Sequence, residues 1–294
     1  FDADRWLDAV ERRRPTMAFL VPAMAQLIAT SDRFEKADLS SLEMVAIGSA
    51  PLPASLHRRL AHRLPEATVS NNYSLTEAGT AFAFLPREEL DRRAGSVGIP
   101  LGTEVRIVDP AGSHAGAGDS GGGPEPLPPG ETGEIMIHVG DRHREYFRDP
   151  EATAQTWSGE WLHTGDLGWM DEDGYLYITG RAKDVIIRGG NNIHAADVEA
   201  VLYQHPAVKE VAVAAVPHDV LGEDVGAWVV LHDDSDLLTG AKAPDVAART
   251  LMDFCSEHLA DYKCPRSVTF MEELPRNPTG KVLKRDLPPA TRQP

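Results

Sequence analysis

The sequence is poor in cysteine and in basic residues. Its 294 residues include two cysteines, Cys255 and Cys264, which are too few for a disulfide framework and lack the second pair typical of a zinc site. Lys and Arg number 29 against 45 Asp and Glu, giving a formal net charge of -16. This excess of acid argues against nucleic acid as a partner, because binding a phosphate backbone requires clustered cations.

Long apolar runs and common hydrolytic motifs are also missing. The longest mostly apolar stretch, residues 16–29, is interrupted by Pro22 and Gln26 and falls short of the ~20 residues of a membrane-spanning helix. No integral membrane segment and no signal segment are predicted, and a reduced, cytoplasmic chain is the simplest expectation. The sequence has no Gly-x-Ser-x-Gly elbow, and its 11 His form no pair at metal-ligand spacing.

A strand, a loop of small residues and a helix follow one another between residues 44 and 64. Met44 to Ile47 form a short apolar run, Gly48-Ser49-Ala50-Pro51 follows, and Pro53 opens a helix with leucines at four-residue spacing. In such an α/β unit the loop after the strand is where ligands usually bind.

The pattern of apolar and turn residues changes twice along the rest of the chain. Short β segments are predicted at 105–109, 133–139 and 175–179, with a Gly- and Pro-rich flexible loop at 111–130 and a hairpin turn at Asp173-Gly174. Further on, strands are predicted at 185–187, 211–216 and 227–231, and helices at 195–202 and 247–259. The tail from Pro275 shows no recognisable element.

The predicted fold class is therefore α/β plus α+β. The α/β unit is followed by a small, mostly antiparallel β subdomain from about residue 94, and the residues after Gly180 form a compact α+β domain.

Polar residues recur at the turns between these apolar segments. Thr76 and Glu77 follow a possible strand at 67–69, where a turn with a helix cap is an equally good interpretation. Asp166 and Arg181 are expected on loops, where a surface ion pair is the alternative. Lys281 lies in a Pro- and Gly-rich loop, where the alternative is a solvated lysine.

Five motifs, taken in order, make a joint pattern. They are GSAPLP (48–53), NNYSLTE (71–77), WLHTGD (161–166), GYLYITGRAKDVIIRGGNNIHAADVE (174–199) and PRNPTGK (275–281). The chain resembles the adenylate-forming superfamily, which includes acyl-CoA synthetases, firefly luciferase-like enzymes and adenylation domains. Such enzymes convert ATP and a carboxylate into an acyl-adenylate and pyrophosphate, and a thiol then displaces AMP.

The resemblance implies roles for particular residues. An ATP- and AMP-binding set is implied at Gly48, Ser49, Ala50, Asn72, Tyr73, Thr76, Asp166, Arg181 and Lys281. In it Tyr73 would lie against adenine, Asp166 and Arg181 would hold the ribose hydroxyls, and Thr76 would bond phosphate oxygens. Glu77 would help to hold Mg²⁺, which prefers oxygen ligands.

The catalytic residues implied are Lys281 and Thr76. Lys281 would reach the oxygen between the acyl group and the phosphate as pyrophosphate leaves. The resemblance also implies that residues 1–182 are the end of a large α/β domain with a small antiparallel β subdomain, and that residues 183–294 are a mobile α+β C-terminal domain. Lys183 matches the hinge about which this domain swings between an adenylating and a thiolating pose, and Gly189 and Gly190 would border the channel for the CoA thiol.

The sequence departs from the family pattern at three places. Ser74 replaces a common Gly, and Ala195 replaces a common Pro at a helix start. The phosphate-binding loop of the family is absent, and we expect it to lie upstream of Phe1. The activity of the chain by itself is therefore left open.

The predicted function is an ATP-dependent carboxylate:CoA ligase, with ATP, Mg²⁺ and CoA as cofactors and co-substrates. Apolar residues at 21–27 and 78–84 favour a fatty or aromatic acid, although core packing explains them equally well. The alternatives are a nucleotide-binding fragment that does not turn over, and an adenylating enzyme with an acceptor other than CoA. The oligomeric state is left open.

Overall fold

The computed structural model describes residues 1–79, 83–110, 125–140, 144–232, 235, 237, 244–277 and 280–291, with Phe84 described by its backbone alone. The chain divides into two compact units, Phe1–Thr179 and Gly180–Pro294. Within the described residues, no helix is both long and apolar enough to cross a membrane.

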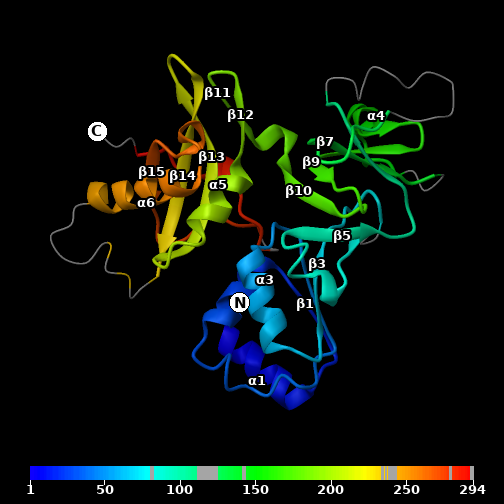
Figure 1. The fold of residues 1–294 in the computed structure, drawn as a ribbon, viewed down its shortest axis with the longest axis vertical. Coiled ribbons are helices and arrows are strands. Elements are labelled where there is room, and N and C mark those ends of the chain that lie inside the picture. The colour runs from blue at the N-terminus through cyan, green and yellow to red at the C-terminus, as the bar shows by residue number, and fades with distance from the viewer. Residues whose placement is uncertain are drawn as a thin grey trace. The chain divides into compact units, whose positions relative to one another are not determined.

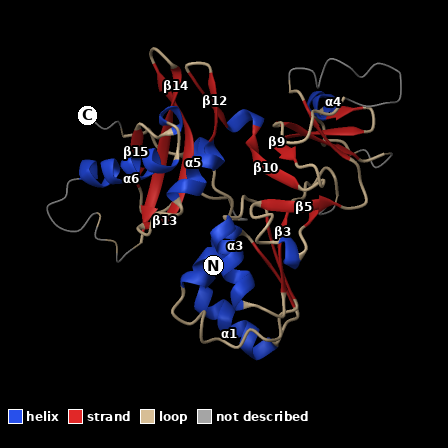
Figure 2. Ribbon diagram, in the orientation of Figure 1, coloured by secondary structure: helices blue, strands red, loops and turns tan. Residues whose placement is uncertain are grey.

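The first unit begins with a three-stranded parallel sheet and three helices (Figures 1 and 2). The strands are in the order β1 (Met17–Leu20), β2 (Met44–Gly48) and β3 (Thr68–Asn72). The helices are α1 (Ala3–Arg13), α2 (Pro22–Thr30) and α3 (Ala54–Arg63). The strand and helix predicted between residues 44 and 64 are confirmed.

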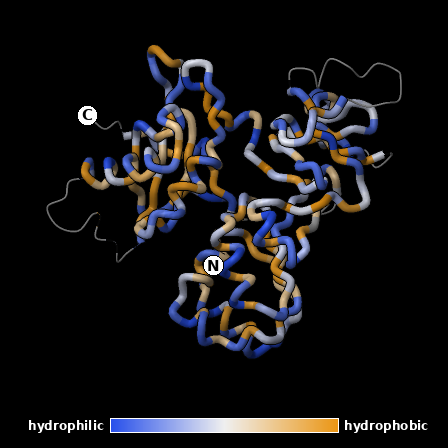
Figure 3. Tube along the Cα trace, viewed as in Figure 1, coloured by the Kyte–Doolittle hydropathy of each residue, from blue (hydrophilic) through white to orange (hydrophobic). Residues whose placement is uncertain are grey.

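Local chemistry explains where these helices begin. The carboxylate of Asp2 caps α1 by accepting a hydrogen bond of 2.9 Å from the backbone N–H of Arg5. Helix α2 has Pro22 at its first position, and α3 follows Pro53. Figure 3 shows both hydrophilic and hydrophobic colours along this part of the chain, as expected for helices with one buried face.

The apolar stretch at 21–27 contributes to the core of this part. Ala25 is fully buried in the cluster around Leu7, Ile28 and Ile47, and Met24 packs against the same cluster. Core packing therefore explains these two residues without an acyl pocket.

The rest of the first unit is an antiparallel sheet in the order β4-β5-β10-β9-β7-β6, with β8 paired to β9. Its strands are β4 (Ala83–Phe84), β5 (Ser96–Pro100), β6 (Val105–Val108), β7 (Gly133–His138), β8 (Trp157–Ser158), β9 (Trp161–Met170) and β10 (Leu176–Arg181). A 3₁₀ turn, η1 (Arg87–Glu89), and a short helix, α4 (Pro150–Thr156), complete it. The predicted hairpin at Asp173-Gly174 is confirmed. Most of the loop predicted at 111–130 lies outside the described residues.

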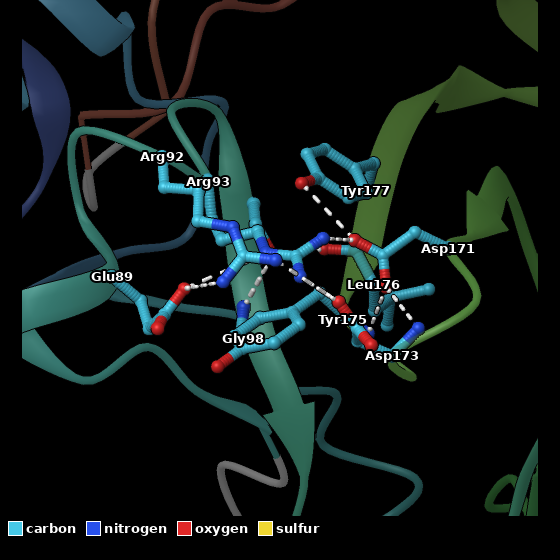
Figure 4. Close-up of polar contacts among 10 residues, drawn as sticks. Glu89, Arg92, Arg93, Gly98, Asp171, Asp173, Tyr175, Leu176 and Tyr177 are labelled. Atoms are coloured by element: carbon cyan, nitrogen blue, oxygen red, sulfur yellow. Dashed lines mark hydrogen bonds and ion pairs between the residues drawn. The ribbon is translucent and has the colours of Figure 1, made fainter.

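Arg93 stabilises the turn of the β9–β10 hairpin (Figure 4). Its guanidinium group bonds Asp171 and Asp173, and it lies 4.5 Å from the ring centroid of Tyr175. The side chain of Arg93 is 11% exposed. Because a planar guanidinium group can bond two carboxylates and stack on a ring at once, one residue fixes the turn that begins β10.

The second unit is a five-stranded sheet with two helices. The strands are in the order β12 (Asn191–His194), β11 (Val185–Arg188), β14 (Gly222–Leu231) and β13 (Val208–His218), and β15 (Ser267–Phe270) pairs with β14 in parallel. The helices are α5 (Ala195–Leu202) and α6 (Pro244–His258), with 3₁₀ turns η2 (Ala182–Asp184), η3 (Asp261–Lys263) and η4 (Lys284–Asp286). Both cysteines are free and buried in this unit.

Both faces of the second sheet are covered. Val211 and Val213 of β13 join the core formed with α5 and α6, whereas Ala212 joins a second cluster with Trp228 and Leu274. The indole N–H of Trp228 donates to the carbonyl oxygen of Pro288 at 2.9 Å. The tail for which the sequence predicts no element therefore packs on the second face of the sheet.

Candidate functional site

The carboxyl ends of β2 and β3 lie side by side. The last residues of these strands, Gly48 and Asn72, are register partners, and a Cβ at Gly48 would lie 2.8 Å from the carbonyl oxygen of Asn72. Only glycine fits at such a distance. Ser49 follows with a φ of 73°, and both Ser49 and Ala50 are exposed. The structure thus brings together the loop at 48–50 and the segment that leads to Tyr73.

Tyr73 contacts Asp166 directly. The Tyr73 hydroxyl donates to Oδ2 of Asp166 at 2.5 Å, and Asp166 is 6% exposed. This burial is incompatible with the alternative of a surface ion pair for Asp166. An aromatic ring and a carboxylate are therefore held together beside the turn after β2.

The loop position expected for Asp166 is wrong, because the residue lies inside β9. The register of β9 against β7 moves from Leu167 opposite Glu134 to His163 opposite Met136. Residues 164–166 consequently face Ile135 alone and form a β-bulge, with Gly165 at a φ of 66°. A bulge of this kind redirects a side chain without ending the strand.

Hydrogen bonds within the bulge fix its shape. The Thr164 hydroxyl donates to the carbonyl oxygen of Ile135 at 2.6 Å and accepts from the backbone N–H of Asp166 at 3.0 Å. Thr164 thereby ties the backbone of Asp166 to the neighbouring strand β7.

Thr76 and Glu77 lie in an isolated turn closed by a bond of 3.0 Å from the N–H of Gly79 to the carbonyl oxygen of Leu75. The alternative of a helix cap is wrong, since the described residues that follow do not form a helix. Arg144 donates to the carbonyl oxygen of Thr76 at 2.6 Å, and the Tyr146 hydroxyl donates to Oε1 of Glu77 at 2.6 Å.

Glu77 fits a role beside a phosphate-bound magnesium ion better than a role in a protein cage. Among the described residues, no group of three or more His, Cys, Asp or Glu side chains could hold a metal ion. Mg²⁺ commonly takes one or two carboxylates and completes its shell with phosphate oxygens and water. With Oε1 oriented by Tyr146, Glu77 presents a carboxylate suited to that arrangement.

The backbone on both sides of Lys281 is held in a narrow hairpin. The N–H of Lys281 donates to Oδ1 of Asn277 at 2.8 Å, and its carbonyl oxygen accepts from the N–H of Asn277 at 2.9 Å. Arg276 donates to the carbonyl oxygen of Gly280 at 2.6 Å and pairs with Glu210 of β13 at 2.8 Å. Residues 278–279 of the motif lie outside the described residues. Lys281 is thus an exposed lysine on an anchored loop.

The remaining predicted residues lie in the second unit, which begins at Gly180. The sequence predicts Arg181 on a loop, but the residue is the last one of β10. Lys183 is exposed in η2. Gly189 and Gly190 form the β11–β12 turn with φ values of 55° and 85°, and the N–H of Gly189 donates to the carbonyl oxygen of Leu221 at 3.0 Å. Such φ values explain why glycines occupy this turn.

Several polar residues around the site are not predicted from the sequence: Glu134, His163, Arg144, Tyr146 and Glu210. Their partners lie far along the chain; Glu134, for example, accepts from the N–H of Gly165 at 3.2 Å. The available signal at Glu134 is a charge directly before the apolar stretch at 135–137, within the predicted strand at 133–139.

Family models match both parts of the chain. Residues 1–147 match the AMP-binding enzyme family, and residues 197–281 match the AMP-binding enzyme C-terminal domain.

Curated relatives include a feruloyl-CoA synthase from Amycolatopsis sp, 38% identical over 98% of this chain and 54% of the relative. A 4-coumarate–CoA ligase 2 from Oryza sativa subsp. japonica is 35% identical over 98% of this chain and 48% of the relative. The chain thus spans about half the length of the curated relatives it matches.

Similar solved structures include the amide bond synthetase McbA from Marinactinospora thermotolerans, with a TM-score of 0.81, 35% identity, and coverage of 97% of this chain and 54% of that one. The anthranilate CoA ligase AuaEII in complex with anthranoyl-AMP has a TM-score of 0.81 and 30% identity, with coverage of 95% and 50%. By its sequence motifs, its fold and these matches, the chain belongs to the adenylate-forming superfamily of AMP-binding enzymes.

Proposed function

We propose that this chain takes part in the ATP-dependent ligation of a carboxylic acid to CoA through an acyl-adenylate. The observation that carries the proposal is the Tyr73–Asp166 pair beside the turn at 48–50. The phenol ring offers a flat apolar surface to adenine, and the carboxylate offers two acceptors to the ribose hydroxyls. Gly48 lets the carbonyl group of Asn72 approach closely, which brings the ends of β2 and β3 together at this turn.

In the first half-reaction, a carboxylate oxygen attacks the α-phosphorus of ATP. The new O–P bond forms as the bond to pyrophosphate breaks, so negative charge moves onto the leaving group. Thr76 donates to phosphate oxygens, and Lys281 stabilises the charge that develops near the bridging oxygen. Glu77 helps to hold Mg²⁺, which when bound neutralises part of the phosphate charge.

In the second half-reaction, the CoA thiol attacks the acyl carbon, a C–S bond forms and AMP leaves. We assign residues 1–182 to the AMP-binding domain and residues 183–294 to a mobile C-terminal domain that turns about Lys183. The turn at Gly189-Gly190 then borders the thiol channel, where the absence of side chains leaves the backbone accessible.

The acid is proposed to be aromatic. The relatives named above act on feruloyl, 4-coumarate and anthranilate groups by their names, and an indoleacetate–CoA ligase from Aromatoleum aromaticum is 35% identical. A long-chain-fatty-acid–CoA ligase, FadD13 from Mycobacterium tuberculosis, is 34% identical, so a fatty acid is the competing substrate. Of the apolar stretch at 78–84, Thr80 to Phe82 lie outside the described residues.

A second acceptor class has its own support. The likeness to an amide bond synthetase favours an amine in place of CoA in the second step. The adenylation half-reaction and the residues assigned to it are the same for both acceptors.

The decisive experiment is acid-dependent exchange of labelled pyrophosphate into ATP, with ferulate, 4-coumarate, indoleacetate and palmitate compared. We expect exchange with an aromatic acid, followed by AMP release that depends on CoA. Release that depends on an amine instead would favour the second acceptor class. AMP binding without exchange would favour a nucleotide-binding chain that does not turn over, and an absence of both would contradict the proposal.

A further inference from the structure

We infer that Glu134 and His163 are positioning residues that hold the bulge of β9 so that Asp166 faces Tyr73. The inference rests on the proposed function, because the role of Asp166 toward the ribose comes from there. His163 lies within the WLHTGD motif and Glu134 lies outside the five motifs, but neither residue has an assigned contact with nucleotide, and each acts through the backbone of residues 164–166.

Glu134 lies on β7, the strand that pairs with β9 on the side of the bulge (Figure 1). Oε1 accepts from the backbone N–H of Gly165 at 3.2 Å, and Oε2 lies 3.3 Å from Nδ1 of His163. The Glu134 carboxylate thus contacts both His163, which precedes Thr164, and Gly165, which follows it. Only one peptide bond separates the Gly165 nitrogen from the Asp166 α-carbon that the bulge must place.

His163 extends this network to the next hairpin. Its Nε2 lies 2.7 Å from the hydroxyl of Ser158 on β8. A carboxylate accepts only, so Nδ1 carries the proton donated to Glu134, and in the neutral ring Nε2 then accepts from Ser158. The side chains of His163 and Glu134 are 5% and 9% exposed. Buried polar groups of this kind order their surroundings only when all of them are paired.

The bulge needs such support because its own strand pairing is interrupted there. Residues 164–166 face Ile135 alone, and Gly165 has a φ of 66° with open space around its Cβ position. Glycine itself has wide conformational freedom, so nothing in its own side chain selects this φ. The hydrogen bond from the Gly165 N–H to Oε1 of Glu134 holds Gly165 at this φ.

The test uses four variants of the full chain. In Glu134→Met the side chain keeps nearly its volume but loses both acceptors. In Glu134→Gln the amide oxygen accepts from Gly165, and the amide N–H donates to Nδ1 once His163 moves its proton to Nε2, so Gln should restore the bulge. Ile135→Val is the matched control, since it trims the same buried strand and leaves the backbone carbonyl that binds Thr164. Asp166→Asn reports on the ribose assignment itself.

The readout is the ratio of dissociation constants for 2′-deoxy-AMP and AMP. A hydrogen bond from a ribose hydroxyl to the Asp166 carboxylate should make this ratio about tenfold or more in the unaltered chain. We expect it to fall toward one in Glu134→Met, to fall in part in Asp166→Asn, where the amide oxygen still accepts but carries no charge, and to persist in Glu134→Gln and in Ile135→Val. Global destabilisation by itself does not change a ratio of two affinities measured on the folded chain.

Each outcome separates the inference from the function on which it rests. A ratio lowered in Asp166→Asn but kept in Glu134→Met would overturn the positioning role and leave the proposed function standing. A ratio near one in the unaltered chain, or no AMP binding at all, would overturn the ribose role of Asp166. Amide hydrogen exchange of residues 163–167 then tests the bulge without any ligand: faster exchange in Glu134→Met than in Ile135→Val is expected, and equal exchange would overturn the inference.

Discussion

The hydroxyl of Tyr73 lies 2.5 Å from a carboxylate oxygen of Asp166, although 93 residues separate the two in the chain. Tyr73 follows the last strand of the parallel sheet, and Asp166 lies within the antiparallel sheet. The contact therefore joins the two sheets of the first unit at the edge where the turn after β2 also lies.

The Tyr73–Asp166 pair can be tested by AMP affinity. Asp166→Ala should weaken AMP binding about 10- to 100-fold, because hydrogen bonds to a charged group contribute roughly 1.5–3 kcal/mol. Tyr73→Phe keeps the ring and should weaken binding less. Calorimetric titration with AMP checks both, and the exposed Glu160→Gln serves as the control. Equal affinities for all four proteins would contradict the assignment.

Lys281→Ala should separate the two half-reactions. Losing one electrostatic contact to developing charge costs roughly 10²–10³-fold in rate, so pyrophosphate exchange should fall by that factor. Thioester formation from a supplied acyl-adenylate should change little. Lys284→Ala is the matched control, because Lys284 lies three residues away and pairs with Glu199 at 2.9 Å. A comparable loss in both half-reactions would argue against the role.

The anchor of the Lys281 loop should influence the same step. Arg276→Ala removes both the ion pair to Glu210 and the bond to the carbonyl oxygen of Gly280. Pyrophosphate exchange should then lie between that of the unaltered chain and that of Lys281→Ala, because the lysine remains but its backbone is held less firmly. Glu210→Gln should give a smaller change in the same direction. Full exchange activity in Arg276→Ala would show that the anchor is dispensable.

The proposed hinge can be tested by Lys183→Pro. Proline fixes φ at this position and restricts Ala182 before it, so a pose that needs different dihedral angles becomes inaccessible. Adenylation and thioester formation, measured in single turnovers, should respond unequally. Lys183→Ala removes the same side chain without the restriction and should leave both rates close to those of the unaltered chain. Equal effects of proline on both steps would rule out a hinge here.

His57 should make the first unit sensitive to acid. Burial lowers the pKa of His57 below the ordinary 6.5, while its hydrogen bond to the carbonyl oxygen of Val69 acts in the opposite direction. The unfolded chain therefore binds a proton near pH 6.5 that the folded chain does not. The free energy of unfolding should fall as the pH drops from 7 to 5, by at most about 1.4 kcal/mol per pH unit from this group.

Denaturant unfolding across this range measures the slope. His57→Asn removes the titrating group, and the variant should show a smaller loss of stability on acidification, whatever its stability at pH 7. An unchanged slope would mean that other groups account for the acid sensitivity.

Local pattern is enough to locate several elements. The predicted helix at 195–202 coincides with α5, and the strand at 44–47 is one residue shorter than β2. These elements follow from the spacing of apolar residues and from turn residues next to them, which are properties of neighbouring positions. The order of the five motifs likewise identified the family from the sequence alone.

Sequence pattern failed where the outcome depended on a distant partner. Asp166 was expected on a loop but lies in a bulge, because the register of β9 against β7 decides how residues 164–166 are accommodated. The tail after Pro275 shows no periodicity, yet it packs on β13 and β14, since an apolar sheet face is available to cover.

Sequence pattern identifies the family and part of the order of the elements, and the resemblance implies which residues contact nucleotide. The folded chain determines which of those residues meet: Gly48 with Asn72, and Tyr73 with Asp166. Only the structure shows that Glu134 contacts both His163 and the backbone N–H of Gly165, next to Asp166. The physical reason is that turns and periodicity are encoded within a few residues, whereas the partners of a buried polar group are set by sheet register across a hundred residues.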